Sequence, residues 1–83
     1  MAFEYDPAKD AANRAKHGIS LARADELRAL AIVDDDRYAE PRLRAYGYLD
    51  GKPYCLAYVV REGRMRAISL RRAHQEEMDD HAG

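Results

Sequence analysis

Arginine side chains are concentrated near the C-terminal end of the chain, over residues 64–72. Strict strand alternation places Arg64 and Arg66 on one face of this segment and Arg71 on the opposite face, at the strand's end. A guanidinium group in that position is well placed to bind a phosphate, because its planar fork can donate to two phosphate oxygens at once. We therefore predict that Arg71 binds a phosphate or stabilises a charged phosphorus centre.

A second arginine-rich segment, residues 42–48, has aromatic rings on the same face as its guanidinium groups. Alternation places four side chains on that face: Arg42, Arg44, Tyr46 and Tyr48. Arginine pairs with phosphate and tyrosine stacks on unpaired bases, so the combination is typical of RNA binding. The competing interpretation is a solvated strand face whose tyrosines cover the sheet. With Arg64 and Arg72, these four residues make up the predicted RNA-binding set.

Cleavage of RNA without a metal ion requires groups that transfer protons beside the reacting phosphate. Lys16 and His17 end a predicted helix, and an imidazole titrates near neutrality. The same two residues would also complement the helix dipole, which is an equally good structural interpretation. Glu40 lies two residues before Arg42, so it is either the partner in an ion pair or a base beside a phosphate anchor.

No set of metal ligands or reactive thiols stands out. Clustered carboxylates at residues 34–36 suit a hard cation such as magnesium, but consecutive side chains diverge and a solvated acidic turn is favoured. His74 and His81 are two ligands without a third. Cys55 is the single cysteine, and its apolar surroundings predict a core residue rather than a nucleophile. We therefore expect no metal and no other cofactor.

Length and composition predict a single folded domain over residues 1–83, with 47% apolar and 35% charged residues. No apolar run approaches the roughly 20 residues that span a bilayer, and no signal-peptide pattern begins the chain, so we expect a cytoplasmic protein. The net charge of −1 is unevenly distributed. Residues 1–36 carry five basic and eight acidic groups (−3), residues 37–72 nine and three (+6), and residues 73–83 none and four (−4). The basic middle is the segment suited to a polyanion.

The first third of the sequence predicts a short strand and two helices. Residues 3–5 can form an edge strand, and Asp6 and Pro7 then predict the start of a helix over residues 7–17. That helix has alanines at the spacing of one face, and Gly18 can cap its end. A short second helix should follow Ser20, with a change to strand near residue 30.

From residue 41 onward the pattern predicts an antiparallel meander. Strand-like segments over residues 41–49, 53–61 and 64–71 are separated by Asp50-Gly51 and Glu62-Gly63, which favour tight turns. The segment 54–60 is apolar on both faces and should be the most buried strand. Residues 74–82 have the composition of a helix with almost no apolar stripe, so we expect a short final helix that is frayed or depends on a partner.

Several segments resemble the BrnT family of bacterial toxins in both order and spacing. They are Phe3-Glu4-Tyr5-Asp6-Pro7, Asn13, Lys16-His17-Gly18-Ile19-Ser20, Asp35-Asp36-Arg37, Glu40 with Arg42, Gly47, and Arg66-Ala67-Ile68-Ser69-Leu70-Arg71-Arg72-Ala73. The resemblance implies an α+β fold of the RelE type. In that fold a short N-terminal strand and two helices pack on a small antiparallel β-meander, and a short C-terminal helix follows.

The resemblance also implies a function, namely that of a toxin in a bacterial type II toxin–antitoxin system. Such a toxin is similar to metal-independent endoribonucleases that cleave RNA and halt translation. A BrnA-like antitoxin would neutralise it in a hetero-oligomer. The alternative is a catalytically weakened, toxin-like interaction module that mainly binds its antitoxin and takes part in operon autoregulation.

Carried onto this sequence, the resemblance makes Arg71 the leading catalytic candidate. The further catalytic candidates are Arg66, Lys16, His17, Glu40, Glu77 and His81. Glu77 falls where the family has a glutamate, and His81 takes the place of an aromatic residue and is a candidate proton donor. The tail over residues 76–81 is acidic where such toxins are basic, and surplus acid repels RNA. This departure from the family pattern is what favours the weakened module.

Overall fold

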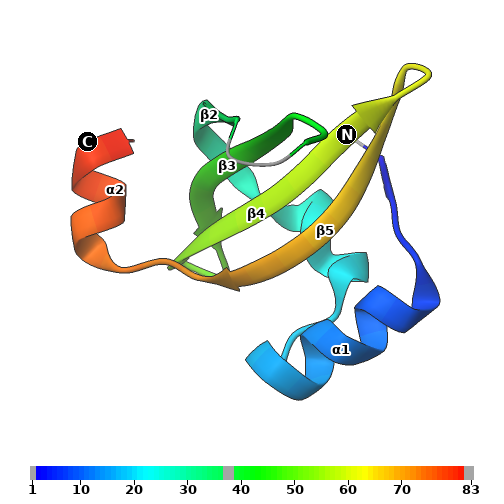
Figure 1. The fold of residues 1–83 in the computed structure, drawn as a ribbon. Coiled ribbons are helices and arrows are strands. Elements are labelled where there is room, and N and C mark those ends of the chain that lie inside the picture. Colours follow the sequence, from blue (N-terminus) through cyan, green and yellow to red (C-terminus); the bar gives the residue numbers. More distant parts are fainter. Residues whose placement is uncertain (1, 37–38, 82–83) are drawn as a thin grey trace.

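A five-stranded β-sheet runs through the protein, of which the computed structural model describes residues 2–36 and 39–81 (Figure 1). The strands are β1 (Phe3–Glu4), β2 (Arg28–Asp35), β3 (Arg42–Leu49), β4 (Lys52–Arg61) and β5 (Arg64–Arg72). Their spatial order is β1-β5-β4-β3-β2, with β1 parallel to β5 and the other neighbours antiparallel. The helical segments in this part of the chain are α1 (Pro7–His17), the 3-10 helix η1 (Leu21–Glu26) and α2 (Gln75–His81). In Figure 1 the sheet lies between α1 and α2.

The predicted fold, a small antiparallel meander with two packed helices, is wrong. The sheet is mixed and larger, because β2 extends it beyond β3 and β1 adds a parallel strand beside β5. Residues 21–26, predicted to be α-helical, form a 3-10 helix. The run over residues 29–33 is too short for periodicity to distinguish strand from helix. The parallel pairing of Phe3 with Met65 joins distant parts of the chain, so no local pattern announces it.

One face of the sheet packs against α1 and η1 and forms the larger hydrophobic core. Its buried side chains are Ile19, Leu21, Ala24, Ala45, Leu49, Leu56, Tyr58, Ala67 and Leu70. β4 is the central strand and buries residues toward both faces, as its apolar sequence predicted. None of the helical segments within residues 2–36 and 39–81 combines the length and hydropathy of a membrane-crossing helix.

The ends of α1 are capped as the sequence predicted. The Oδ1 atom of Asp6 accepts a hydrogen bond from the N–H of Ala8 at 2.8 Å. Gly18 adopts the left-handed conformation with φ 72°, and its N–H donates to the carbonyl oxygen of Arg14 at 2.9 Å. These caps determine that His17 stands in the last turn of the helix.

A buried asparagine, rather than the alanines, docks α1 on the sheet. The alanine face suggested by the sequence is exposed: Ala8, Ala11, Ala12 and Ala15. Asn13 is 5% exposed, and its Nδ2 donates to the carbonyl oxygens of Ile19 and Leu70, each at 2.9 Å. Its Oδ1 accepts from the N–H of Leu70 at 3.0 Å. The carboxamide therefore satisfies both backbone groups of Leu70 at the place where a neighbouring strand would otherwise pair.

A β-bulge in β5 changes which arginines share a face. The pairing register shifts between Ala57 and Tyr58 of β4, where Ile68 is the extra residue of β5. Because alternation restarts after the bulge, Arg66 and Arg71 lie on the same face of the sheet. The strict alternation assumed from the sequence had placed them on opposite faces.

Replacing Asn13 with alanine is expected to lower the free energy of unfolding by about 2–4 kcal/mol, because three buried backbone groups lose their partner. Asn13→Asp should be at least as destabilising, since a carboxylate oxygen would then face the carbonyl oxygens of Ile19 and Leu70. Urea denaturation followed by circular dichroism measures the change. Arg14→Ala is the control, because this side chain is 68% exposed on the same helix and its loss should cost within about 0.5 kcal/mol. A loss for Asn13→Ala no larger than that of the control contradicts the docking role.

Candidate functional site

Most of the residues that could perform chemistry lie on the face of the sheet that α2 covers, which we call the arginine face. Cross-strand pairing aligns its side chains in two rows across β5, β4 and β3, Arg71-Cys55-Tyr46 and Ser69-Ala57-Arg44. Arg42 follows at the start of β3, opposite Asp35 of β2. The arginine face comprises Asp35, Arg42, Arg44, Tyr46, Cys55, Ala57, Ser69 and Arg71.

Three guanidinium groups line a hollow of about 170 Å³ on this face, which we call the arginine hollow. Its lining residues are Asp35, Arg42, Arg44, Cys55, Ala57, Ser69 and Arg71. Arg44 is held in place because its Nη1 donates to the Tyr46 hydroxyl at 2.8 Å and its Nε lies 3.5 Å from the Asp35 carboxylate. The buried Arg44 Nε has no hydrogen-bond partner among the described residues. The lining thus holds more basic than acidic side chains, which suits an anion, although Glu77 of α2 already pairs with Arg71.

Lys16 and His17 line a second hollow, of about 200 Å³, which adjoins the first at Ser69. Partial burial, and then the charges of Lys16 and Arg71, lower the pKa of His17 from its ordinary value. The imidazole is therefore neutral near pH 7 and able to accept a proton. The structure thus brings the predicted Lys16-His17 pair next to Arg71, although they are more than fifty residues apart in the sequence.

Glu40 lines a third hollow, of about 290 Å³, which adjoins the arginine hollow at Arg42. The Glu40 carboxylate pairs with Arg61, whose Nη2 lies 2.9 Å and whose Nε lies 3.0 Å from Oε1. This ion pair joins Glu40 to β4, whereas the sequence suggested an ion pair with Arg42. Lys9 and Ile68 line both the second and the third hollow, so the three hollows form one connected surface.

α2 closes the arginine face through an ion pair between Glu77 and Arg71. The two terminal nitrogens of the guanidinium donate to the two carboxylate oxygens at 2.8 and 3.0 Å. Glu77 also accepts the backbone N–H of His74 at 2.8 Å, which caps the start of α2. The hydrogen bonds from Arg71 are the main reason that the pKa of Glu77 falls to about 2. The same contact raises the pKa of Arg71, so both side chains remain charged.

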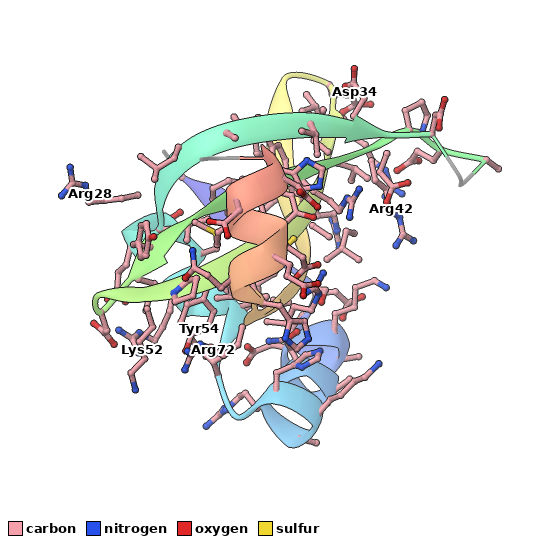
Figure 2. All side chains as sticks on the ribbon, turned by 90° about the vertical axis from the view of Figure 1, so that its left-hand side faces the viewer. Arg28, Asp34, Arg42, Lys52, Tyr54 and Arg72 are labelled. Atoms are coloured by element: carbon pink, nitrogen blue, oxygen red, sulfur yellow. The ribbon has the colours of Figure 1, made fainter. Side chains whose placement is uncertain are left out.

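Tyr46 lies beneath α2 and is 0% exposed. Its ring stacks on the imidazole of His81, with centroids 4.6 Å apart and planes at 15° (Figure 2 shows α2 crossing in front of the sheet). Met78 is buried beside it against Cys55 and Ala73. Cys55 is buried, as predicted for a core residue, and burial raises the pKa of its thiol. A base could reach Tyr46 only after α2 moved away, so the stacking of Tyr46 on an RNA base stays a prediction.

Arg64 and Arg66 lie near the edge formed by β1. Both approach the carboxylate of Glu4, at 3.8 and 3.9 Å respectively. Arg66 shares a face with Arg71 but does not line the arginine hollow. Tyr48 is 36% exposed and lies near the C-terminal end of β3, whereas Arg42 and Arg44 lie near its start. These residues could contact a long polyanion only at its periphery.

Arg72 lies on the other face of the sheet from Arg71, because neighbouring strand residues alternate. Its guanidinium stands 5.6 Å from the ring centroid of Tyr54, and its Nε donates to the carbonyl oxygen of Pro53 at 3.3 Å. In Figure 2, Arg72 and Tyr54 lie on one side of α2 and Arg42 on the other. The structure therefore separates Arg72 from the arginine face.

The sequence interpretation missed Asp35 and Ser69 as site residues. Asp35 was assigned to a solvated acidic turn, but it is 5% exposed within β2 and pairs with Arg44. The signal was strand alternation, which continues through the acidic run and turns Asp35 inward. Ser69 could have been found by its place two residues before Arg71.

Within residues 2–36 and 39–81, no group of three or more His, Cys, Asp or Glu side chains is arranged to hold a metal ion.

Comparisons with known proteins agree on one family. Residues 5–77 match the family described as "Ribonuclease toxin, BrnT, of type II toxin-antitoxin system". Among solved structures, the Brucella abortus ribonuclease toxin, BrnT, matches with 26% sequence identity and a TM-score of 0.69, over 90% of this chain and 99% of that chain. No curated protein sequence matches. The fold is accordingly similar to that of BrnT, and the expectation of a RelE-type fold is corrected.

Acidification is expected to release α2 from the arginine face. The pKa of Glu77 in the folded protein is about 2, below its ordinary 4.5, so the ionised carboxylate stabilises docking. That stabilisation is complete above pH 4.5 and is lost as the pH falls through 2. The rate at which a dithiodipyridine reagent modifies Cys55, which α2 helps to bury, measures the release.

Glu77→Gln provides the control for the acid titration, because its modification rate should already be high at neutral pH and should lack this transition. Circular dichroism at each pH verifies that the sheet is intact. Equal pH profiles for the wild-type and Glu77→Gln proteins would show that this carboxylate does not hold α2.

Proposed function

The chain belongs to the BrnT family of ribonuclease toxins from type II toxin–antitoxin systems, and on this basis we propose that it cleaves RNA on the arginine face without a metal ion. The observation that carries the proposal is the hollow in which Arg42, Arg44 and Arg71 meet, with His17 in the adjoining hollow. Guanidinium groups can supply the charge stabilisation that a divalent cation supplies in other nucleases.

The reaction that these groups suit is attack of a ribose 2′-hydroxyl on the adjacent phosphorus. A bond forms between the 2′-oxygen and phosphorus, and the bond from phosphorus to the 5′-oxygen breaks. The products are a 2′,3′-cyclic phosphate and a 5′-hydroxyl, which takes up the proton that balances the one removed from the 2′-hydroxyl. The lowered pKa of His17 favours its neutral imidazole as the group that accepts the first proton. Arg71 stabilises the charge on the phosphate oxygens, and Lys16 adds positive charge beside it.

The connected hollows supply a path for the rest of the RNA backbone. Arg42 lines both the arginine hollow and the third hollow, where Arg61 and Glu40 lie. Glu40 is a second candidate base on this path, held by its ion pair with Arg61. Arg64 and Arg66 lie farther along the same face of β5 and extend the positive charge toward β1. This distribution favours backbone contacts, and hence RNA cleavage with relaxed sequence preference.

A type II family implies an antitoxin partner. We propose that the partner is a BrnA-like protein and that it neutralises the toxin in a hetero-oligomer by covering the arginine face. The edge strand β2 offers a partner further apolar surface, since Leu30 and Ile32 are 58% and 50% exposed there. The match over residues 5–77 supports a single toxin domain over residues 1–83. We propose that this domain acts in the cytoplasm, where translation takes place.

The alternative function is a toxin-like subunit that has lost catalysis and mainly binds its antitoxin, with a part in operon autoregulation. The observation in its favour is the ion pair between Glu77 and Arg71, which neutralises the leading catalytic candidate. The two functions differ in whether the purified protein cleaves RNA at all.

Arg71→Ala is expected to abolish growth arrest on expression and to reduce the rate of RNA cleavage by about 10²–10³-fold, because it removes the principal donor to the reacting phosphate. Gel analysis of labelled RNA incubated with purified protein measures the rate. Binding to the antitoxin should persist, which separates loss of catalysis from loss of folding.

Arg28→Ala is the charge-matched control for the Arg71 experiment. Arg28 is exposed at the start of β2, far from Arg42 in Figure 2, and its loss should leave cleavage within about threefold of the wild type. Arg72→Ala tests the assignment of faces, since the neighbouring arginine should matter much less than Arg71. An equal loss for Arg71→Ala and Arg28→Ala would contradict the proposed site, and absence of cleavage by the wild type would support the interaction module.

Cleavage is expected to continue undiminished in excess EDTA, because the proposed mechanism relies on guanidinium groups and an imidazole. The measurement is the initial cleavage rate with and without the chelator at constant ionic strength. A rate that collapses with EDTA and returns with added magnesium would require the acidic residues 34–36 to be reconsidered as metal ligands.

A further inference from the structure

Two contacts of α2 on the arginine face, from Glu77 to Arg71 and from His81 to Tyr46, are made with side chains that the sequence predicted to bind phosphate or RNA. We propose that α2 occupies a nucleotide subsite, with Glu77 in the place of an RNA phosphate on Arg71 and His81 in the place of a base on Tyr46. The inference rests on the proposed ribonuclease function and identifies single-stranded RNA as the ligand that competes with α2. It makes the C-terminal helix a cover that substrate displaces.

The contact between Glu77 and Arg71 has the geometry of phosphate recognition. Two parallel hydrogen bonds, at 2.8 and 3.0 Å, join a planar guanidinium to two oxygens of one anion. A phosphate group presents two oxygens to arginine in the same manner. The arginine hollow continues from this point toward Arg42 and Arg44, so a phosphate bound in place of Glu77 would meet further positive charge.

The contact between His81 and Tyr46 has the geometry of a base on an aromatic platform. The rings are 4.6 Å apart and nearly parallel, and imidazole is a flat heteroaromatic ring like the five-membered ring of a purine. Tyr46 is held in position by Arg44, whose Nη1 donates to its hydroxyl at 2.8 Å and whose guanidinium lies 5.7 Å from its ring centroid. His81 itself is exposed, and Met78 packs beside Tyr46 in the same buried cluster.

The spacing of the two contacts matches one nucleotide. Glu77 and His81 are four residues apart and therefore lie on one face of α2, separated by about one helical turn of 5.4 Å. Their partners Arg71 and Tyr46 stand in the same cross-strand row, on either side of Cys55. A phosphate on Arg71 and its neighbouring base on Tyr46 would occupy that row together.

α2 is built to be displaced. It has seven residues, below the roughly 12–15 at which an isolated helix becomes even marginally stable in water. Met78 is its one buried side chain within the described residues, so little apolar area holds it. The remaining contacts are the ion pair and the ring stack, both of which RNA can replace. Substrate and helix therefore compete for the same two partners.

Removing the Glu77 charge has a different effect under this role than under the catalytic role that the sequence suggested for Glu77 and His81. If Glu77 transferred a proton, removing its charge would slow cleavage and leave RNA binding unchanged. If Glu77 occupies the phosphate position, removing its charge strengthens RNA binding. The two roles are therefore separated by one substitution.

Glu77→Gln is the test variant, because glutamine can still accept the N–H of His74 that caps α2 but no longer carries the charge that pairs with Arg71. Glu76→Gln is the matched control, since Glu76 is an exposed acidic neighbour on the same helix. The probe is a short single-stranded RNA, 2′-O-methylated to prevent cleavage and fluorescein-labelled for anisotropy. His81→Ala and a chain ending at Ala73 open the same face by other means, and circular dichroism verifies that each variant is folded.

The expected result is binding about tenfold tighter for Glu77→Gln than for the wild type, with a smaller gain for His81→Ala and little change for Glu76→Gln. Cys55 should react faster with a thiol reagent in Glu77→Gln, since α2 no longer covers it. Unchanged or weaker binding by Glu77→Gln, when the wild type binds RNA, overturns the subsite. Should neither the wild type nor any opened variant bind or cleave RNA, the proposed function itself fails.

Discussion

The position of Arg71 depends on the buried carboxamide of Asn13, and much of the arginine face follows from that contact. By bonding to both backbone groups of Leu70, Asn13 takes the place of a missing strand beside the C-terminal half of β5. Arg71 is the next residue, and His17 lies on the same helix as Asn13, one turn further on. A single docking contact therefore sets the guanidinium and the imidazole beside each other. Because it joins α1 to β5 across 57 residues, it turns two distant sequence segments into one site.

The second organising interaction, between Glu77 and Arg71, joins the acidic tail of the chain to its basic middle. The tail folds onto the basic middle as α2, where the Glu77 carboxylate pairs with the guanidinium of Arg71 while Glu76, Asp79 and Asp80 stay exposed. An acidic C-terminus is thus compatible with an RNA-binding surface, provided that the tail can leave. The same helix buries Tyr46 and Cys55, so its departure would expose an aromatic ring together with the arginine.

Local sequence patterns predicted several helix ends and turns, but they did not predict how these elements pack against one another. Asp6 and Gly18 mark the ends of α1, and the Asp50-Gly51 and Glu62-Gly63 turns have the positive φ angles that such dipeptides favour. The bulge at Ile68 and the parallel partner of β1 arise from contacts between distant segments, which no window of sequence contains. The alanine face of α1 misled for a related reason, since the helix is docked by one satisfied polar side chain.

The same distinction applies to the candidate site, where residues within one regular strand were predictable and residues that depend on distant contacts were not. Arg42 and Arg44 were correctly placed together by strand alternation, because β3 is regular where they lie. Arg72 and Glu40 could not be placed, since the first depends on which face Arg71 takes and the second on an ion pair with Arg61 from another strand. Nothing in the composition of residues 75–81 indicated that they would cover Tyr46, because the helix is anchored by specific contacts and not by an apolar stripe.

Binding of RNA on the arginine face can be observed residue by residue by NMR chemical-shift mapping. The measurement is a titration of isotopically labelled protein with a 2′-O-methylated single-stranded RNA. The largest changes should fall on the side-chain N–H groups of Arg71 and Arg44 and on the imidazole of His17, accompanied by changes throughout α2. Changes confined to Arg72 and Tyr54 on the opposite face, with Arg71 and His17 unaffected, would show that RNA does not bind on the arginine face.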